Sequence, residues 1–158
     1  MSTITQTEVQ VASAAPDFTL PSTAGGSVTL SAYRGKNNVL LAFFPLAFTS
    51  VCTAELCSFS DDLSVFEQNG TKVFGISVDA IPSQKAFAEK HALKTELLSD
   101  MKREVSRLYG VLLEDQYFSK RAYFLIDRKG VVRWKHIEAE LGQRRQNAEI
   151  LAEIAKLT

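Results

Sequence analysis

The stretch N38-V39-L40-L41-A42-F43-F44-P45-L46-A47-F48-T49-S50-V51-C52-T53-A54-E55-L56-C57 decides the fold of this chain. Its first part is an unbroken apolar run that a proline ends at residue 45. An apolar run without alternation is typical of a central strand that is covered on both faces. A second run of this kind is K-V-F-G-I-S-V, residues 72–78. We therefore expect two buried strands.

The segment between these runs predicts a helix over residues 53–68. Four apolar residues recur at helical spacing along one stripe of it, and these are Leu56, Phe59, Leu63 and Phe66. The pair N69-G70 then supplies residues that close a helix. Because a strand, a helix and a strand cross over with a fixed hand, the two strands of this unit should run parallel.

The rest of the chain predicts further elements around this unit. They are a hairpin over 17–30 with a Gly-Gly turn, a helix opening at Pro82, a short helix over 101–109, a second hairpin over 121–135, and a C-terminal helix. This order predicts an α/β fold, with a mixed central sheet, helices on both faces and an N-terminal β-hairpin extension. In such sheets chemistry gathers beyond the carboxyl ends of the strands, where residues 45–52 lie.

Length and composition indicate one domain and exclude several classes of partner. A chain of 158 residues suits a single domain spanning 1–158, and we expect its polar residues 1–14 to form a mobile tail. Eighteen Lys and Arg balance eighteen Asp and Glu, so neither nucleic acid nor a membrane is an expected partner. The first residues lack the pattern of a secretory signal, and no apolar run is long enough to span a bilayer. We therefore expect a cytoplasmic protein with free thiols.

Cys52 is the first candidate for chemistry. If the helix begins between Ser50 and Thr53, this cysteine lies in the first turn, where unpaired backbone N–H groups and the helix dipole favour a thiolate. A thiolate near neutral pH is a nucleophile. Thr49 stands three residues earlier and can direct its hydroxyl to the same point, while Pro45 ends the strand and can wall off a pocket.

The spacing P45-x-x-x-T49-x-x-C52 after a buried strand resembles the active-site motif of the peroxiredoxin family. The resemblance covers almost the whole chain. It runs from A15-P16-D17-F18-T19-L20, through G75-I76-S77-V78-D79 and L98-S99-D100, to R121-A122-Y123-F124-L125-I126-D127-R128-K129-G130. It implies a thioredoxin-like fold and a thiol-dependent peroxidase that needs no metal or organic cofactor.

The resemblance also implies roles for residues outside the motif. Arg121 falls where the family carries its active-site arginine, whose fixed donors would hold Cys52 as a thiolate and stabilise charge on a leaving oxygen. Glu55 matches a position that is acidic in several branches. It either stabilises the helix dipole or orients an arginine, and both interpretations stay open. Phe48, inside the motif loop, is a candidate for the wall of a peroxide pocket.

Cys57 is a candidate resolving cysteine. On an ideal helix, residues five apart lie about 8 to 9 Å from each other, beyond the reach of a disulfide, so Cys52 and Cys57 could join only if the first turns unwind. The C-x-x-x-x-C spacing resembles the bacterioferritin comigratory protein branch, in which the second cysteine resolves the first. The motif string with Glu55 resembles the alkyl hydroperoxide reductase E type, many of which use one cysteine. The alternative is that Cys57 is a small buried hydrophobe.

The expected function is reduction of hydrogen peroxide, organic hydroperoxides or both, through a sulfenic acid on Cys52. The expected partners are the peroxide, thioredoxin or another small thiol reductant, and a second copy of the chain in a homodimer. A peroxide sensor or redox-switched binding protein would use the same cysteine. A dithiol–disulfide oxidoreductase would instead carry C-x-x-C at the helix start, where Thr49 takes the place of the first cysteine.

Overall fold

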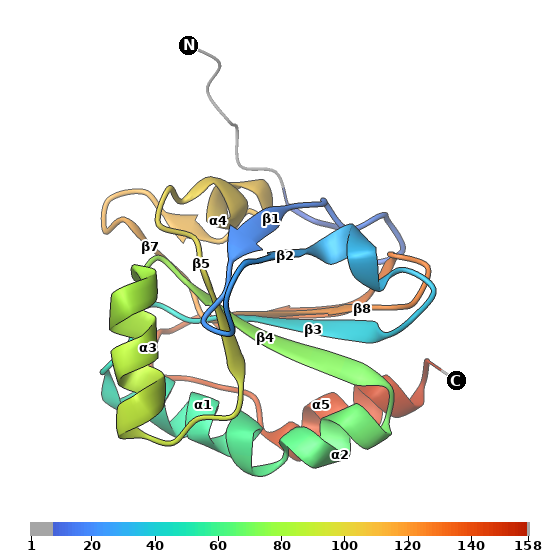
Figure 1. Ribbon diagram of the computed structural model, residues 1–158. Helices are drawn as coiled ribbons and strands as arrows, with labels where there is room; N and C mark the ends of the chain where they lie inside the picture. Colours follow the sequence, from blue (N-terminus) through green and yellow to red (C-terminus); the bar gives the residue numbers. More distant parts are fainter. Residues whose placement is uncertain (1–7, 158) are drawn as a thin grey trace.

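A mixed five-stranded sheet forms the centre of the molecule. The computed structural model describes residues 8–157 (Figure 1). The strands lie in the order β5-β4-β3-β8-β9. Their bounds are Asn38–Phe43 for β3, Thr71–Ser77 for β4, Glu96–Ser99 for β5, Ala122–Ile126 for β8 and Val132–Ile137 for β9. The mixed sheet and thioredoxin-like arrangement predicted from the sequence are confirmed.

The pairing of β3 follows from its unbroken apolar run. This strand lies in the middle of the sheet, parallel to β4 on one side and antiparallel to β8 on the other. All of its residues are buried, because both of its faces are covered. The predicted hairpin over 121–135 is β8 and β9, which pair antiparallel.

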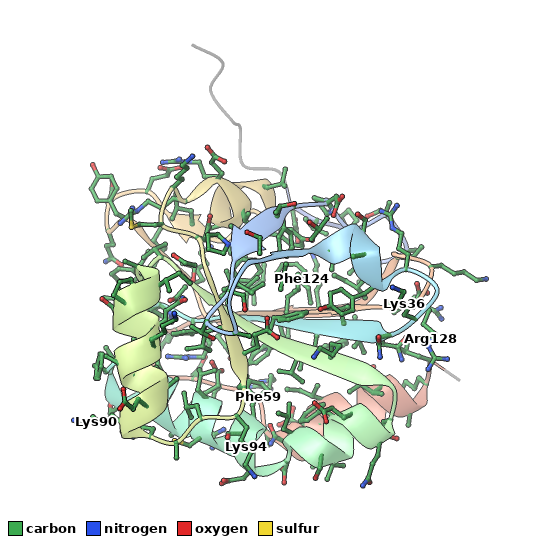
Figure 2. All side chains as sticks on the ribbon, in the orientation of Figure 1. Lys36, Phe59, Lys90, Lys94, Phe124 and Arg128 are labelled. Carbon is green, nitrogen blue, oxygen red and sulfur yellow. The ribbon has the colours of Figure 1, made fainter. Side chains whose placement is uncertain are left out.

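Side-chain alternation along β3 divides the core into two clusters. Val39, Leu41 and Phe43 point to one face, which we call the upper face after its place in Figure 1. Leu40 and Ala42 point to the opposite, lower face. The period of two residues in a strand produces this division. Figure 2 shows one member of each cluster, with Phe124 above the sheet and Phe59 below it.

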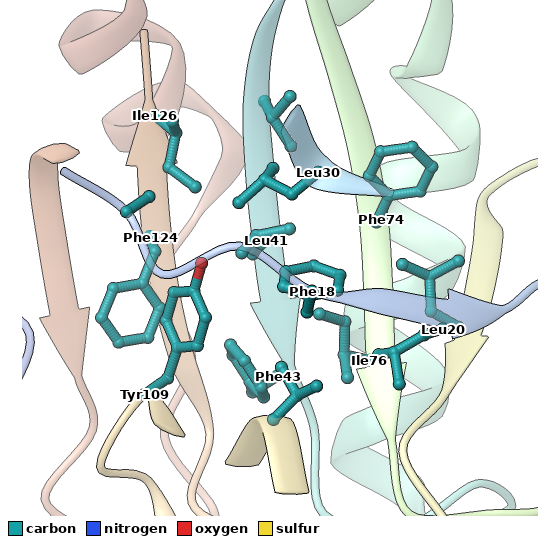
Figure 3. Close-up of a cluster of buried hydrophobic side chains, with 14 of the residues drawn as sticks. Phe18, Leu20, Leu30, Leu41, Phe43, Phe74, Ile76, Tyr109, Phe124 and Ile126 are labelled. Atoms are coloured by element: carbon teal, nitrogen blue, oxygen red, sulfur yellow. The ribbon is translucent and has the colours of Figure 1, made fainter. Parts of the chain in front are cut away.

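The upper face is closed by short elements. They are β1 (Thr19–Pro21), β2 (Ser27–Thr29), the 3-10 helix η1 (Leu30–Tyr33) and α4 (Glu104–Leu108). β1 and β2 form the predicted antiparallel hairpin. Figure 3 shows the aromatic centre of this cluster, where Tyr109 packs against Phe43 and Phe124. The Tyr109 hydroxyl donates a hydrogen bond to the Pro16 carbonyl at 2.6 Å.

The lower face is closed by helices. They are α1 (Ser50–Asp61), α2 (Leu63–Gln68), α3 (Ile81–Lys90) and α5 (Asn147–Ala155). The helix predicted over 53–68 begins three residues earlier and breaks at Asp62, which lies outside helical geometry at φ −101° and ψ 11°. Its predicted stripe is confirmed, because Leu56, Phe59 and Phe66 are all buried in the lower cluster.

Gly75 lets the helix approach the sheet closely. A Cβ atom at this position of β4 would lie 2.8 Å from Leu97 Cδ2, 3.0 Å from Leu56 Cδ1 and 3.1 Å from Phe44 Cε1. Three side chains of the lower cluster therefore occupy the space of the missing methyl group. Any larger residue would push α1 or β5 outward.

Two parts of the chain differ from the sequence-based expectation. The helix predicted over 101–109 begins only at Glu104, because Arg103 adopts the left-handed conformation at φ 64° and the Asp100 carboxylate accepts the backbone N–H groups of Val105 and Ser106. A small hairpin follows that the sequence did not predict. It consists of β6 (Leu112–Leu113) and β7 (Phe118–Ser119).

The segment before β1 lies along the sheet edge. Of the predicted mobile tail over 1–14, residues 1–7 lie outside the described residues. From residue 8 onward the chain packs against the β8–β9 turn, since Val9 is buried and the Ala12 N–H donates to the Val132 carbonyl at 2.7 Å. Between residues 8 and 157, no helix has the length and apolar character needed to cross a membrane.

Candidate active site

The site lies at the carboxyl end of β3, where the motif loop turns into α1. Asp79, which follows β4, holds this loop in place. Its carboxylate accepts hydrogen bonds from the Ala47 N–H at 2.9 Å and the Ser77 hydroxyl at 2.7 Å. Asp79 therefore fixes the loop that precedes Cys52.

Cys52 is the third residue of α1 and so lies in its first turn, as expected for a helix that begins at Ser50. Thr49 is the N-cap residue, and its carbonyl accepts the first helical hydrogen bond from the Thr53 N–H at 2.9 Å. The N–H groups of the first turn therefore have no partner within the helix, and the positive end of its dipole lies here. The Cys52 side chain is fully buried, so its sulfur lies in a water-poor environment that also has positive potential.

Arg121 brings a positive charge directly to that sulfur. It lies immediately before β8, and its Nη2 donates to Cys52 Sγ at 3.2 Å. The same side chain is only 2 % exposed. Its Nε and Nη2 also donate to the Leu141 carbonyl at 3.3 and 3.1 Å. Burial lowers the pKa of Arg121, but the charges of Glu55 and Cys52 outweigh that effect and raise it, so the guanidinium stays positive.

Glu55 lies one turn after Cys52 and pairs with the arginine. Its Oε1 accepts from Arg121 Nη1 at 3.1 Å, and the carboxylate is 1 % exposed. The residue lies beyond the first turn of α1, so its position matches orientation of Arg121 better than stabilisation of the helix dipole. Burial raises the pKa of Glu55, while Arg121 and the hydrogen bond from Tyr123 act in the opposite direction.

Tyr123 completes the buried cluster, and the sequence analysis did not assign it to the site. Its hydroxyl donates to Glu55 Oε2 and accepts from the Arg145 N–H at 3.0 Å. The available signal was its spacing, because residues two apart in an extended segment, here the residue before β8 and the second residue of β8, point to the same face. Burial, together with the charge of Glu55, raises the pKa of Tyr123, so the phenol remains protonated.

A cavity of about 270 Å³ opens beside this cluster. It brings together three residues predicted for the site, Pro45, Thr49 and Arg121. Its other walls are mostly apolar and include Leu46, Val51, Phe118 and Leu141. Larger cavities of about 350, 490 and 500 Å³ include neither Cys52 nor Arg121 in their walls, and the last of them adjoins this cavity through Leu141 and Gly142. Arg121 both lines the smaller cavity and contacts the sulfur, so this cavity is the candidate substrate site.

Two predicted residues have partners other than those expected. The Thr49 hydroxyl donates to the Leu46 carbonyl at 2.9 Å, so its proton is engaged within the loop. Phe48 has a positive φ of 67° and is 51 % exposed. Its ring packs edge-on against Phe87 of α3, with centroids 5.2 Å apart, and does not line the cavity beside Arg121.

Cys57 lies in a different environment from Cys52, although both are free thiols. It is partly exposed on the same helix. Burial and the neighbouring charge of Asp61 raise the pKa of Cys57, which favours its protonated form. With α1 intact, the two cysteines stand five positions apart on one helix.

The loop over residues 138–146 also contributes to the site, and sequence reasoning missed it. The loop supplies the Leu141 carbonyl to Arg121 and the Arg145 N–H to Tyr123. The buried Glu138 fixes the loop by accepting from Arg145 Nε at 2.7 Å. Backbone groups are common to all residue types, so no sequence pattern could identify these contacts. Within residues 8–157, no group of three or more His, Cys, Asp or Glu side chains is placed to hold a metal ion.

Comparison with known proteins gives a consistent set of relatives. The model of the AhpC/TSA family matches residues 11–135. Alkyl hydroperoxide reductase E of Mycobacterium tuberculosis is 40 % identical over 132 residues, which cover 82 % of this chain and 86 % of that protein. Peroxiredoxin-2 of Mus musculus is 39 % identical over 134 residues, covering 78 % and 67 %. The reduced 2-Cys peroxiredoxin of Plasmodium vivax superposes with a TM-score of 0.86 at 33 % identity, covering 92 % and 80 %.

Proposed function

This chain belongs to the AhpC/TSA family and is a peroxiredoxin, a thiol-dependent peroxidase, and we propose that Cys52 is its peroxide-reactive cysteine. One observation carries this assignment. The sulfur of Cys52 is fully buried at a helix start and accepts a hydrogen bond from the Arg121 guanidinium at 3.2 Å. A buried cation at this distance favours a thiolate, which is the nucleophilic form of cysteine.

The first step transfers one oxygen to the sulfur. The Cys52 thiolate attacks the terminal oxygen of the hydroperoxide, and an S–O bond forms as the O–O bond breaks. The electron pair of the broken bond leaves on the second oxygen, which takes up a proton and departs as water or an alcohol. Cys52 is thereby oxidised to sulfenic acid. The Arg121 guanidinium, which already lines the cavity, stabilises the charge on the leaving oxygen.

Thr49 and Pro45 shape the position of the peroxide in this proposal. Both line the cavity beside Arg121. With its proton on the Leu46 carbonyl, the Thr49 hydroxyl oxygen is an acceptor for the peroxide O–H. Pro45 has no backbone N–H and leaves no competing donor at its position. The mostly apolar walls suit an alkyl group, so we propose organic hydroperoxides as substrates alongside hydrogen peroxide.

The second step depends on Cys57. In our proposal, α1 unwinds over residues 52–57 after oxidation, and the Cys57 thiol condenses with the Cys52 sulfenic acid to give a disulfide and water. The raised pKa of Cys57 keeps it protonated until this encounter, so it does not compete for peroxide. Thioredoxin or another small thiol then reduces the disulfide. We place the cycle in the cytoplasm, where such reductants act, and the protein in a homodimer.

Intact-mass analysis after one equivalent of peroxide tests both steps. The parent should lose about two mass units by forming a disulfide, and Cys57→Ser should instead gain one oxygen as a sulfenic acid. A lasting sulfenic acid in the parent would reject Cys57 as the resolving residue. Repeated turnover with a dithiol reductant supports the enzyme. If the parent instead consumes one equivalent of peroxide and stays oxidised in the presence of the reductant, the alternative of a peroxide sensor is favoured.

A further inference from the structure

Tyr123 occupies a central position in the buried cluster without contacting the sulfur. It lies on the lower face of β8, fully buried, two residues after Arg121. Its hydroxyl donates to Glu55 Oε2 and accepts from the Arg145 N–H at 3.0 Å. Hydrogen bonds therefore run without interruption from Cys52 Sγ through Arg121, Glu55 and Tyr123 to the backbone of the 138–146 loop.

This chain of contacts fixes the orientation of the Arg121 guanidinium. Arg121 meets the sulfur with Nη2 and the carboxylate with Nη1, so its plane depends on where Glu55 holds its oxygens. Glu55 has several rotatable bonds, and one hydrogen bond to Arg121 leaves its second oxygen undefined. The Tyr123 hydroxyl binds that second oxygen. We propose that Tyr123 is a positioning residue for the peroxidase reaction, acting through Glu55 on Arg121.

The same loop supports both ends of this arrangement. Its Leu141 carbonyl accepts from Arg121, and its Arg145 N–H donates to Tyr123. Glu138, buried at the start of the loop, donates its backbone N–H to the Arg121 carbonyl at 2.9 Å and binds the Arg145 side chain. Tyr123 therefore couples the placement of this loop to the orientation of the guanidinium.

The charges around Glu55 agree with a positioning role. Arg121 and Tyr123 contact its carboxylate from the sheet, Arg144 acts on it from the loop, and Cys52 lies one turn earlier on α1. The Tyr123 hydrogen bond opposes the effect of burial on the pKa of Glu55. Loss of the hydroxyl would therefore weaken both the alignment and the charge of the carboxylate that holds Arg121.

Tyr109 provides a matched control within the same molecule. It is also fully buried, and its hydroxyl also makes a short hydrogen bond, to the Pro16 carbonyl at 2.6 Å. It belongs to the upper cluster, on the opposite face of the sheet from Tyr123. Tyr109→Phe and Tyr123→Phe thus remove the same group from comparable environments, and only one of these groups is connected to Arg121.

The experiment compares two reactions of the Cys52 thiol in these variants, each made in a Cys57→Ser background. Oxidation by hydrogen peroxide needs an oriented guanidinium for the leaving oxygen, whereas alkylation by iodoacetamide needs only the thiolate. We expect Tyr123→Phe to lower the oxidation rate constant about tenfold and the alkylation rate constant by no more than about twofold. Tyr109→Phe should change neither by more than about twofold. An unfolded thiol would still be alkylated but would lack the oriented guanidinium, so both rates are measured where urea denaturation shows that each variant is fully folded.

Three outcomes would overturn the inference. They are an unchanged oxidation rate in Tyr123→Phe, an equal loss of oxidation and alkylation, and the same change in ratio for Tyr109→Phe. The inference rests on the proposed function, but the two fail in different ways. If the parent protein itself does not react with peroxide through Cys52, the proposed function fails. If the parent reacts and the two phenylalanine variants have the same ratio, only the role of Tyr123 fails.

Discussion

The upper and lower faces of the central sheet are sealed in similar ways but enclose different chemistry. On the upper face, rings such as Phe43, Phe124 and Tyr109 pack against one another (Figure 3). The lower face also has an aromatic and aliphatic cluster, yet at the carboxyl end of β3 it encloses the ion pair of Arg121 and Glu55. Both faces come from the same alternating strands.

In our proposal, the upper face supplies stability alone, whereas the lower face also supplies reactivity. Burying an ion pair costs desolvation free energy that the attraction between the charges often fails to return in full. A packed apolar cluster has no such cost. On the lower face, the costly buried ion pair lies next to the Cys52 thiol. On the upper face, the buried Tyr109 hydroxyl needs only one partner, a backbone carbonyl. Substitutions on the two faces should therefore separate catalysis from stability.

The largest expected effect is the loss of the thiol on the lower face. Cys52→Ser should abolish peroxide consumption, because a serine hydroxyl is not ionised near neutral pH and cannot replace the thiolate. The volume change is small, so the unfolding transition should stay close to that of the parent. Peroxide consumption with a dithiol reductant measures the first quantity and urea denaturation the second. Consumption at the parent's rate would remove the basis of the proposed function.

On the upper face the largest effect should be on stability. Phe74 is fully buried in the upper cluster, and Phe74→Ala should lower the free energy of unfolding by about 3–5 kcal/mol, because the ring leaves a cavity. Below the unfolding transition, the rate constant of Cys52 oxidation should stay within about twofold of the parent. Urea denaturation and stopped-flow oxidation measure the two quantities. A large loss of oxidation rate in the folded variant would show that the faces are not independent.

Arg121→Lys should affect the lower face by a smaller amount. The charge remains, but lysine has a single ammonium and cannot contact the sulfur, Glu55 and the Leu141 carbonyl in one plane. We expect the rate constant of Cys52 oxidation to fall about 10²-fold, which is near the lower end of the rate loss that follows removal of one oriented hydrogen-bond donor. Arg133→Lys, on the exposed side of β9, is the control. A fall of less than about threefold would mean that charge alone is sufficient.

The smallest effect concerns Cys57, at the edge of the lower face. Burial, and to a smaller extent the charge of Asp61, raise the pKa of this thiol, so Asp61→Asn should lower that pKa. In a Cys52→Ser background, where Cys57 is the only thiol, the pH midpoint of alkylation by iodoacetamide should therefore move to lower pH. Glu67→Gln, on exposed α2, should leave the midpoint in place. A midpoint that Asp61→Asn does not move would show that burial alone sets the reactivity of Cys57.

Sequence patterns predicted the parts of this molecule that depend on residue type. Unbroken apolar runs located β3 and β4, and the helical stripe located α1 and α2. The motif around Cys52 and the position of Arg121 predicted two residues that lie 3.2 Å apart in the structure, although 69 positions separate them in the chain. The strands and helices were predictable because periodicity is a property of the side chains, whereas Arg121 was located only by the resemblance of its segment to the family.

The features that were missed depend on backbone groups or on partners. The Leu141 carbonyl and the Arg145 N–H contact the cluster through backbone atoms that all residues share, apart from the N–H that proline lacks. The two-residue strands β6 and β7 are too short to show a period. The Thr49 hydroxyl was expected to be directed to the same point as the Cys52 sulfur, but it donates to the Leu46 carbonyl, as threonine side chains often bond to local backbone.

The missing side chain of Gly75 has a consequence for how freely this sequence can vary. Leu56 fills the space that a methyl group would occupy, and it is adjacent to Glu55 on α1. Substitution with alanine would move this helix by a few tenths of an ångström, a displacement that the long Arg121 side chain would have to follow to keep its contact with the sulfur. Gly75 has no side chain of its own, yet it helps to set the distance between Cys52 on α1 and Arg121 just before β8. We therefore expect substitutions at Gly75 to lower activity more than substitutions at many of the residues that line the cavity beside Arg121.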